Sequence, residues 1–421
     1  MRAYVGLALL SVVGLLLAGP ASVQADPLPA AIDLNSAAAD LTVYGDDAGD
    51  YSGHALAAGD INGDGTDDLI IAAPYADPAG ETYVIYGGNS LPSTIDLSSA
   101  AADVSVHGDD AGDAAGISVR AADINGDGSD DLIIGARSAD PTGGEDAGET
   151  YVIYGGGSLP SIIDLSGTAA DLTVYGDDAG DISGNAVAGG DINGDGFDDL
   201  IIAAPHADPV GGEEAGEAYV IYGAGSLPST INLDSTAADL TVYGDDAYDH
   251  FGSGIDVGIA AGRINGDGVD DLIIGASLAD PPGGVNAGKA YVIYGGGSLP
   301  STIYLSSTAA DLTVYGDDAG DDCSYAVATG DINGDGTDDL IIGARAADPA
   351  GETYVIYGAA SQPVGGIAEL PYASGSSSPN YLPWAGPGLA AVTLAGLAAA
   401  AAVVITTGAW YAARRWLRHK A

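Results

Sequence analysis

The ten residues Asp60-Ile61-Asn62-Gly63-Asp64-Gly65-Thr66-Asp67-Asp68-Leu69 recur almost letter for letter later in the chain. Further copies begin at Asp123, Asp191, Arg263 and Asp331, and an Ile-Ile pair follows each of the five copies. Consecutive copies lie 63 to 72 residues apart, which is too long for a two-helix solenoid unit and suits a four-stranded propeller blade. The repeat therefore decides the fold class and the place to look for function.

Each unit contains four short segments typical of β-strands, separated by turns rich in Gly and Asp. In the first unit these segments are residues 41–44, 55–58, 68–71 and 82–86. The Leu-Ile-Ile run of the third segment is continuously apolar, as expected for a strand covered on both faces. Segments typical of helices are confined to the two ends of the chain. We therefore predict an all-β fold, a β-propeller of about five blades over residues 26–358.

The repeated loop offers oxygen atoms at alternate positions. The side chains at positions 1, 3, 5 and 9 are Asp or Asn, position 7 offers a main-chain carbonyl, and the intervening glycines let the chain curl around one centre. Position 12 is Ile71 in the first copy, where a helix-loop-helix calcium hand carries Glu, so an EF-hand or a dockerin is disfavoured. The pattern favours a hard cation, calcium before magnesium. Asx-turns that hold no ion are the alternative.

The argument for an ion is electrostatic. Three carboxylates that converge within ~4 to 5 Å repel by roughly 3 to 4 kcal/mol per pair at an effective dielectric near 20, and a turn alone has no reason to accept that cost five times. The predicted metal ligands are Asp60, Asn62, Asp64, Thr66 and Asp68; Asp123, Asn125, Asp127, Ser129 and Asp131; Asp191, Asn193, Asp195, Phe197 and Asp199; Asn265, Asp267 and Asp271; and Asp331, Asn333, Asp335, Thr337 and Asp339.

The fourth copy departs from the pattern because Arg263 stands where the other copies have Asp. A guanidinium group at that place would sit among the carboxylates. We predict that an internal salt bridge of Arg263 replaces the ion, which leaves about four full Ca²⁺ sites and one degenerate site.

The loop and its surroundings resemble the FG-GAP repeat of integrin alpha-chain N-terminal domains and of related bacterial surface proteins. In that family an acidic turn precedes a Phe-Gly pair, the calcium loop and then Gly-Ala-Pro, and residues 244–246, 251–252, 263–272 and 275–277 follow that order. The resemblance spans about residues 31–358. Phe-Gly is kept only at residues 251–252, and Gly-Ala-Pro is altered in every copy. The resemblance implies a calcium-binding propeller that binds an extracellular ligand.

In the same family the sequence repeat is offset from the blade. The offset implies that an N-terminal strand at residues 41–44 completes the last blade, beside a third strand at residues 353–357, and so closes a ring of five blades. An incomplete or self-associating ring is the alternative.

The two ends of the chain predict export and anchoring. Residues 1–25 have the charge, apolar run and small-residue end of a secretory signal peptide. A Gly/Ser/Pro stalk is expected at residues 359–384, a transmembrane helix at residues 385–413 and a basic cytoplasmic tail at residues 414–421. Residues 382–386, Leu-Pro-Trp-Ala-Gly, also resemble a sortase signal, although that family usually has Thr in the fourth place. An Ala-rich soluble helix is a further alternative for the apolar stretch.

Charge and residue types narrow the function. The net charge of −50 disfavours nucleic acid and anionic lipid as partners. The histidines are few and scattered, and packing explains His107 and His206; with no nucleophile beside a base, we predict that the chain is not an enzyme. An integrin-alpha-like adhesion or ligand-binding propeller on the cell surface is expected, with an unidentified extracellular protein or glycan as partner. A lectin-like propeller and a sortase-anchored wall protein are the alternatives. The loops of variable length, where partner contacts are expected, are residues 140–149, 208–217 and 280–289.

Overall fold

The computed structural model describes residue 34 and residues 39–99, 101–141, 144–167, 169–209, 212–233, 238–254, 257–305 and 310–359. The predicted signal peptide, the transmembrane helix, the basic tail and all but the first residue of the stalk lie outside the described residues. Within those residues, no helix is long and apolar enough to cross a membrane. The part described is built from strands, with a short 3-10 helix at Leu97–Ser99, so the all-β prediction is confirmed.

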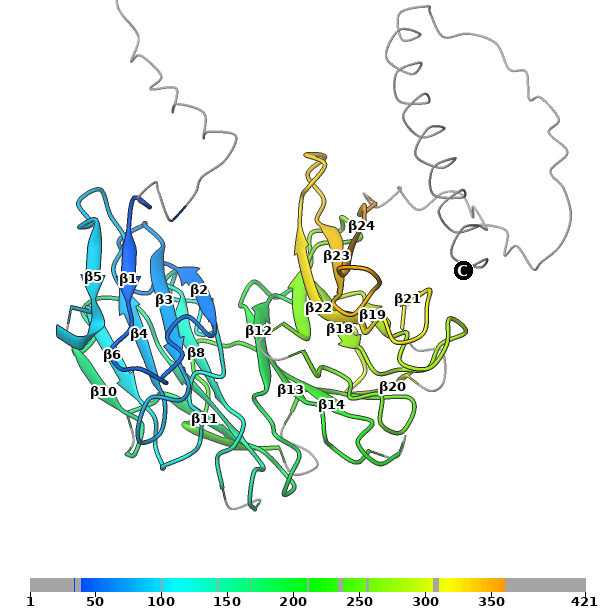
Figure 1. Cartoon of the computed structure of the whole chain (residues 1–421), viewed down its shortest axis with the longest axis horizontal. Helices are drawn as coiled ribbons and strands as arrows, with labels where there is room; N and C mark the ends of the chain where they lie inside the picture. Colours follow the sequence, from blue (N-terminus) through cyan, green and yellow to red (C-terminus); the bar gives the residue numbers. More distant parts are fainter. Residues whose placement is uncertain are drawn as a thin grey trace, which may run out of the picture. The chain divides into compact units, whose positions relative to one another are not determined.

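Four propeller-like blades share one antiparallel strand order (Figure 1). Blade 1 consists of β2 (Leu56–Gly59), β3 (Asp68–Ala73), β4 (Glu81–Ile85) and β6 (Val104–His107). Blade 2 consists of β7 (Ser118–Ala122), β8 (Asp131–Ala136), β9 (Glu149–Ile153) and β11 (Leu172–Tyr175). Blade 3 consists of β12 (Ala186–Gly190), β13 (Asp199–Ala204), β14 (Glu217–Ile221) and β16 (Leu240–Tyr243). Blade 4 consists of β17 (Ile259–Gly262), β18 (Asp271–Ala276), β19 (Lys289–Ile293) and β21 (Leu312–Tyr315).

At three of the four junctions between blades a short parallel strand joins one blade to its successor, which the sequence pattern did not predict. The segment after the third strand of one blade reaches back and pairs with the outer strand of the blade before it. Thus β10 (Ile162–Asp164) pairs with β6, β15 (Thr230–Asn232) with β11, β20 (Thr302–Tyr304) with β16, and β5 (Thr94–Asp96) with β1 (Thr42–Tyr44). Blades 1 to 4 are therefore joined to one another at their outer edges by backbone hydrogen bonds.

The blades pack face to face, and their apolar residues form one core between each neighbouring pair. The first strands of the blades contact one another in the order β2, β7, β12, β17 and β22. The central isoleucine of each second strand is fully buried in the first four blades, at Ile70, Ile133, Ile201 and Ile273. This confirms that the Leu-Ile-Ile run is covered on both faces.

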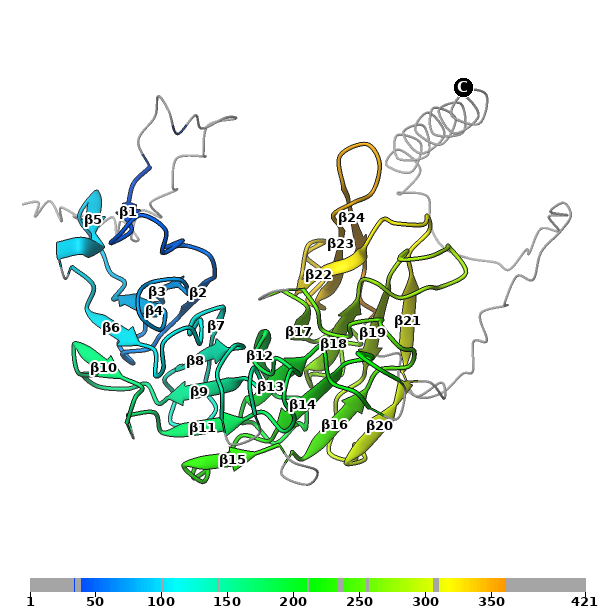
Figure 2. The same ribbon diagram turned by 60° about the horizontal axis from the view of Figure 1, so that its bottom comes forward.

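The predicted closure of the ring is wrong for the described chain. The last blade, blade 5, consists of β22 (Cys323–Gly330), β23 (Asp339–Ala344) and β24 (Glu352–Ile356), and no fourth strand pairs with β24. Strand β1 pairs with β5 alone, and β1 and β24 stand at opposite ends of the row of blades (Figures 1 and 2). The five blades therefore form an open row, with blade 1 at one end and blade 5 at the other (Figures 1 and 2).

Candidate functional site

Each of the five repeated loops joins the first strand of a blade to its second strand. We call them the Asp loops, residues 60–69, 123–132, 191–200, 263–272 and 331–340, and number their positions from 1. Because each loop occupies the same place in its blade, all five lie at the same end of the strands. A residue predicted to bind metal in one Asp loop therefore has a counterpart in the loops of the other blades, along one side of the row of blades.

Position 1 organises the loop through backbone hydrogen bonds. The carboxylate of Asp60 accepts the N–H of Asp64 at 2.9 Å and the N–H of Gly65 at 2.7 Å. The corresponding bonds recur at Asp123, Asp191 and Asp331. The carboxylate at position 5 in turn accepts the N–H at position 7, as at Asp64, where the distance is 2.9 Å. These carboxylates curl the loop in the way the Gly and Asp pattern predicts.

Position 9 carries a buried carboxylate in all five loops, at Asp68, Asp131, Asp199, Asp271 and Asp339. In blade 2 the carboxylate of Asp131 accepts the N–H and the side-chain amide of Asn125, both at 3.1 Å, and the N–H of Gly155 at 2.8 Å. Burial raises the pKa of Asp131 to about 7, although these N–H groups oppose the rise. No ion pair to a position-9 carboxylate is found among the described residues. A carboxylate so placed has room for a cation as a ligand but has no protein cation of its own.

The carboxylates of one loop do not converge as closely as predicted. Among the described residues, two other clusters bring three ligand atoms within 4.8 Å of one another: His206, Glu214 and His250, and Asp245, Asp246 and Asp249. In the Asp loops the carboxylates turn instead toward backbone N–H groups, which satisfy them and keep like charges apart. The donor set fits a hard cation in residue type and spacing, and the side chains would have to turn inward to meet one.

Arg263 forms a salt bridge, but not with the predicted ligands of its loop. Its Nε lies 3.2 Å from Oδ1 of Asp270, at position 8, and its side chain is largely exposed. The N–H of Asp267 bonds to Asn265 at 2.8 Å, in the absence of a carboxylate at position 1. The guanidinium group thus lies at the rim of the loop and binds Asp270, whose carboxylate also accepts the N–H of Asp191 in the preceding blade.

The acid at position 8 links neighbouring blades, a role that the repeat motif did not predict. In each of four junctions, a position-8 carboxylate accepts the position-1 N–H of the preceding blade. The bonds run from Asp60 to Asp130 at 2.8 Å, Asp123 to Asp198 at 3.1 Å, Asp191 to Asp270 at 3.0 Å and Arg263 to Asp338 at 2.9 Å. The position-8 N–H returns a bond to the position-1 carbonyl in each case. The doubled Asp-Asp of every copy was the available signal.

Position 7 also contributes its side chain to the junction, beyond the carbonyl predicted as a ligand. Ser129, Phe197 and Val269 lie against the position-4 glycine of the preceding loop, where a Cβ would clash with Ser129 or Phe197 and would crowd Val269. The Asp loops are therefore packed into one another from blade to blade. Occupancy of one loop and the stability of the neighbouring junction should be coupled.

The acidic turns at the other end of the strands surround the first residue of each third strand. That residue is Glu149 in blade 2 and Glu217 in blade 3, and burial raises the pKa of each to about 7. In blade 4 the residue is Lys289, whose ammonium group lies 2.9 Å from Asp245 and 3.3 Å from Asp249. One buried cation thus replaces one buried acid in a single blade.

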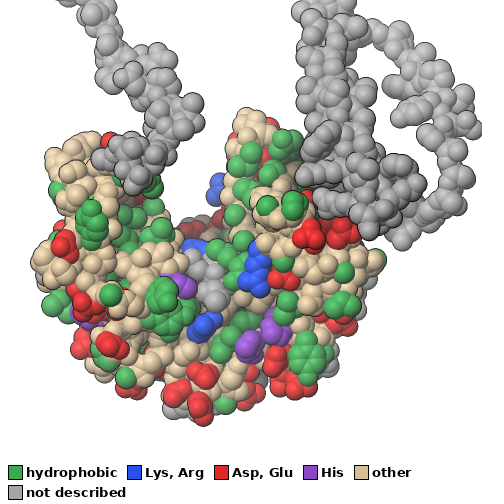
Figure 3. All heavy atoms as spheres, viewed as in Figure 1, with side chains coloured by type: hydrophobic (Ala, Val, Ile, Leu, Met, Phe, Trp, Pro, Cys, Tyr) green, Lys and Arg blue, Asp and Glu red, His purple; other side chains and the backbone are tan. Residues whose placement is uncertain are grey.

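A cavity of about 430 Å³ opens at this same end of the strands. Its lining includes Arg137, His206, His250, Tyr325 and Arg345. On the face drawn in Figure 3, the basic and histidine side chains gather near the middle, and the acidic side chains lie around the outside. In a chain of net charge −50, this gathering makes the cavity a local exception to the acidic surface.

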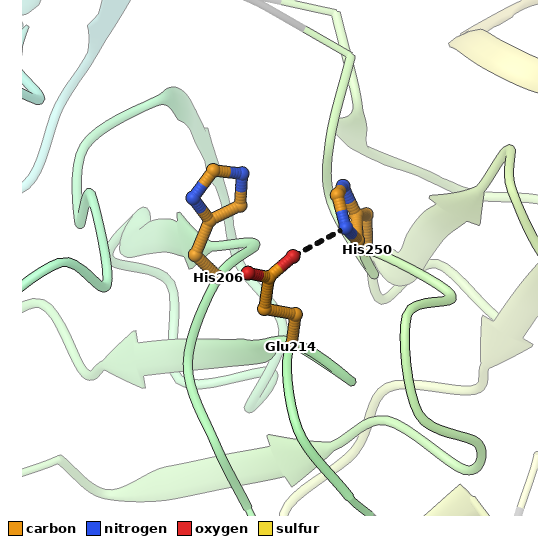
Figure 4. A group of neighbouring side chains, drawn as sticks. All are labelled: His206, Glu214 and His250. Atoms are coloured by element: carbon orange, nitrogen blue, oxygen red, sulfur yellow. Dashed lines mark hydrogen bonds and ion pairs between the residues drawn. The ribbon is translucent and has the colours of Figure 1, made fainter.

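His206 packs against a second histidine, and it also lines the cavity. It is half-buried, lines the cavity, and its ring centroid lies 5.0 Å from that of His250 in an edge-to-face contact. The Nε2 atom of His250 lies 2.9 Å from Oε2 of Glu214 (Figure 4). Burial and the neighbouring His250 lower the pKa of His206, and Glu214 opposes this shift. Glu214 belongs to the variable loop at residues 208–217, and Asp146, from the variable loop at residues 140–149, lines the cavity itself.

Comparison with known proteins identifies the repeat. Five segments match the FG-GAP repeat, at residues 52–85, 115–153, 183–221, 257–293 and 324–356. The chain carries five FG-GAP repeats. Each match begins just before or at a first strand and ends at the third strand, so an FG-GAP repeat supplies three strands, and the fourth strand lies between repeats. This is the offset between repeat and blade that the resemblance implied.

Proteins similar in sequence to this chain include phospholipases and integrin alpha chains. Phosphatidylinositol-glycan-specific phospholipase D of Dictyostelium discoideum is 30% identical over 248 residues, 54% of this chain and 26% of that protein. The protein of the same name from Bos taurus is 34% identical over 210 residues, 48% of this chain and 23% of that protein. Integrin alpha pat-2 of Caenorhabditis briggsae is 30% identical over 234 residues, 54% of this chain and 18% of that protein. The chain is thus distantly homologous to integrin alpha chains and to these phospholipases, and it aligns with about a quarter or less of each.

Proposed function

We propose that this chain is a calcium-stabilised ligand-binding protein of the cell surface, an adhesion or recognition module comparable to the head of an integrin alpha chain. The observation that carries the proposal is the buried position-9 carboxylate, repeated in five loops and without a protein cation in the described chain. A divalent ion supplies the missing positive charge, and its binding free energy then adds to the stability of the fold.

Calcium is the expected cation. Asp, Asn and main-chain oxygen atoms are hard ligands, and their number and flexible loop setting suit calcium better than magnesium. We assign full sites to the loops beginning at Asp60, Asp123, Asp191 and Asp331, and a degenerate one to the Arg263 loop. The hydrogen bonds of position 1 hold the loop curled, and the carboxylates at positions 5 and 9 are the groups that would turn toward the ion.

The ligand is proposed to bind at the opposite end of the strands, around the cavity lined by Arg137, His206, His250 and Arg345. Arg137, together with Arg345, which is itself paired with Asp322 at 3.0 Å, favours an anionic group such as a carboxylate of a protein or an acidic glycan. Export and a single membrane anchor at residues 385–413 belong to this proposal, with the blades outside the cell. A lectin-like propeller and a sortase-anchored wall protein remain the alternatives.

We do not propose an enzyme. The phospholipase relatives extend well beyond the aligned FG-GAP region, and this chain aligns with 26% of the Dictyostelium protein. The side-chain hydrogen bond that the structure shows for the His250 ring runs to the carboxylate of Glu214, and not to one of the serines that line the same cavity. A hydrolase assay on glycan-anchored protein with the full chain tests this; release of the anchor would contradict the proposal.

The experiment for the calcium proposal is thermal unfolding of the full chain with calcium and with a chelator, together with a count of bound ions. We expect about four ions per chain and a midpoint lowered by tens of degrees on chelation, which follows if each ion contributes a few kcal/mol of linkage. An unchanged midpoint with no retained calcium would show that the Asp loops are only turns.

A further inference from the structure

The cluster of His206, Glu214 and His250 is peculiar to one junction, although the backbone around it is repeated. The N–H of His250 bonds to the carbonyl of Glu214 at 3.3 Å, and the same bond joins Ile182 to Asp146 at 3.0 Å and Asp322 to Asn286 at 3.2 Å. The fold therefore builds this place several times, and among the described residues it is filled with two imidazoles and a carboxylate once. The cluster therefore depends on the side chains at this junction, because the repeated backbone alone does not produce it.

The geometry of the cluster suits a metal that prefers nitrogen ligands. One ligand atom from each of the three residues lies within 4.8 Å of the others. His206 and Glu214 come from the loop between β13 and β14, and His250 comes from the turn before β17, so the ligands are fixed from two blades (Figure 4). All three are half-buried, which limits competition from water. Two imidazoles with one carboxylate form a ligand set that catalytic zinc sites use, with a further position open.

We propose that His206, Glu214 and His250 bind one Zn²⁺ ion, at a site separate from the oxygen-rich Asp loops. Nitrogen ligands select zinc and its neighbours over calcium, so the two ions would not compete for one place. The three protein ligands leave one coordination position, and the adjoining cavity with Arg137 gives an anionic group access to it. The ion would also cross-link blade 3 to blade 4.

The test is zinc binding to the full, untagged chain with its calcium present, measured after desalting by elemental analysis and by calorimetric titration of Zn²⁺ alone. We expect one zinc per chain to be lost in His206→Gln and in His250→Gln. His107→Gln is the matched control, because His107 Nδ1 lies 3.0 Å from Glu81 Oε1 but has no second histidine in a described metal cluster. Equal zinc content in the wild type and in the two cluster variants would overturn the proposal, as would no retained zinc in the wild type.

Two further readouts separate ligation from folding. The calcium-loaded midpoint of each variant reports whether it is folded, and a folded Glu214→Gln variant should bind zinc more weakly. Cobalt in place of zinc gives visible absorption bands that depend on its ligands, so the wild-type spectrum should change in His206→Gln and not in His107→Gln. Failure of calcium binding would leave this result intact, because the zinc ligands are not part of the Asp loops.

A second inference rests on a different observation, the two ends of the row of blades. Ile332, at position 2 of the last Asp loop, is 60% exposed, whereas Ile61, Ile124 and Ile192 at the same position are fully buried. On β2, Leu56 is 56% exposed, whereas Val119 on β7 is fully buried. The last blade thus exposes the face that every other blade buries against its successor, and the first blade exposes the face that every other blade buries against its predecessor.

Hydrogen-bonding groups at the two ends match in the same way. At four junctions the position-1 N–H bonds to a position-8 carboxylate of the next blade. The N–H of Asp331 has no such acceptor among the described residues, and the carboxylate of Asp67 has no such donor. A Cβ on Gly330 or Gly334 would also meet nothing within 4 Å, unlike one on Gly59 or Gly63. Blade 5 thus offers the N–H of Asp331 and the open space beside its glycines. Blade 1 offers the carboxylate of Asp67 and side chains that would fill that space.

The strands show the same complementarity. Strand β24 lacks the outer strand that every other blade has, and β1 has the sequence and the parallel partner of such an outer strand. Transferring the register of β9 with β11 places Tyr44 opposite Glu352 and Thr42 opposite Tyr354. Addition of a free strand to an open sheet edge is a common mode of protein association.

We infer that blade 5 of one copy of this chain receives blade 1 and β1 of a second copy. The interface is heterologous, so it builds closed rings or rows of chains. It repeats the contacts of the four internal junctions, which is why a second copy fits better than an unrelated partner. Closure of one chain on itself would use the same groups and is an outcome that the test separates.

Sedimentation of the full chain in detergent, with Leu56→Asp and Ile332→Asp variants, tests the inference. Leu56→Asp disrupts the exposed face of blade 1, and Ile332→Asp disrupts that of blade 5. Each variant alone should therefore stay monomeric at concentrations at which the wild type associates. A mixture of the two should form a dimer and nothing larger, because one intact face of each remains. A wild type that stays monomeric at all concentrations, or a mixture that does not pair, would overturn the inference. Paired cysteines at Thr42 and Tyr354 should form disulfides between chains and not within one.

Discussion

The ammonium group of Lys289 lies 2.9 Å from the carboxylate of Asp245, in a blade where the repeat otherwise places a glutamate. Lys289 is buried, and Asp249, at 3.3 Å, is buried as well. Desolvation alone would lower the pKa of Lys289, but the two carboxylates outweigh it and raise the pKa. Blade 4 thus places a cation beside its acidic turn, where blades 2 and 3 place a glutamate.

Replacing Lys289 by Met should destabilise the protein by about 3 to 5 kcal/mol, since removing one partner of a buried ion pair strands the other. The measurement is urea unfolding with calcium present. Lys289→Glu should be tolerated better at pH 5 than at pH 8, because it recreates the acid cluster of the other blades. A Met variant as stable as the wild type at neutral pH would show that the pair contributes nothing.

The buried glutamates predict how stability depends on pH. Burial raises the pKa of Glu149 and of Glu217 from the ordinary 4.5 to about 7. Between those two values the folded chain holds protons that the unfolded chain has released, so folding stability should fall as the pH rises from about 5 to 8. Chelated protein should therefore melt at a lower temperature at pH 8. Glu149→Gln should flatten this profile, whereas the exposed Glu145→Gln should leave it unchanged.

The same substitution, Asp to Ala at position 8, should lower the stability of the fold by different amounts in different blades. Asp198→Ala removes the acceptor of the Asp123 N–H at the junction of blades 2 and 3. We expect a loss of about 1 to 3 kcal/mol, the cost of leaving a partly buried donor unpaired. Asp67→Ala in blade 1 should cost little in a single chain, because no preceding blade bonds to it among the described residues. Equal losses in dilute protein would contradict the assigned role.

Arg263 offers a gain of function. Arg263→Asp restores position 1 of the fourth Asp loop and removes a guanidinium group from its rim. We expect the number of bound calcium ions to rise from about four to about five, and Asp123→Ala to lower it to about three. Equilibrium dialysis with radioactive calcium measures both. An unchanged count in Arg263→Asp would mean that the fourth loop either binds already or fails for another reason than Arg263.

Much of the fold could be predicted because the information is local and repeated. The Gly and Asp pattern of residues 60–69 predicts the curled loop, and the Leu-Ile-Ile run predicts a doubly covered strand; both are confirmed. Ring closure could not be predicted from these residues, because the turn between blades comes from contacts such as Phe197 against Gly126. Those contacts join residues about 70 positions apart and leave no periodic signal of their own.

The site was predicted in the same uneven way. The loops and their residue types follow from the sequence, but the orientation of each carboxylate depends on which N–H groups lie nearby. The role of Asp130 was missed because its partner, the N–H of Asp60, belongs to another blade. His206, Glu214 and His250 lie in separate segments of two blades. Their proximity follows from the packing of the blades and could not be seen in the sequence.

At four junctions the position-1 N–H of one blade bonds to the position-8 carboxylate of the next blade, and this regularity bears on how the gene can change in length. Each blade presents the same donors to its successor and the same acceptors to its predecessor. Blades are therefore interchangeable parts, and an unequal crossover that inserts or removes one whole repeat creates no unmatched surface inside the array. Length can vary between generations without a new interface having to arise, and substitutions in one blade, such as those that gathered two histidines beside Glu214, can accumulate while the others keep the scaffold.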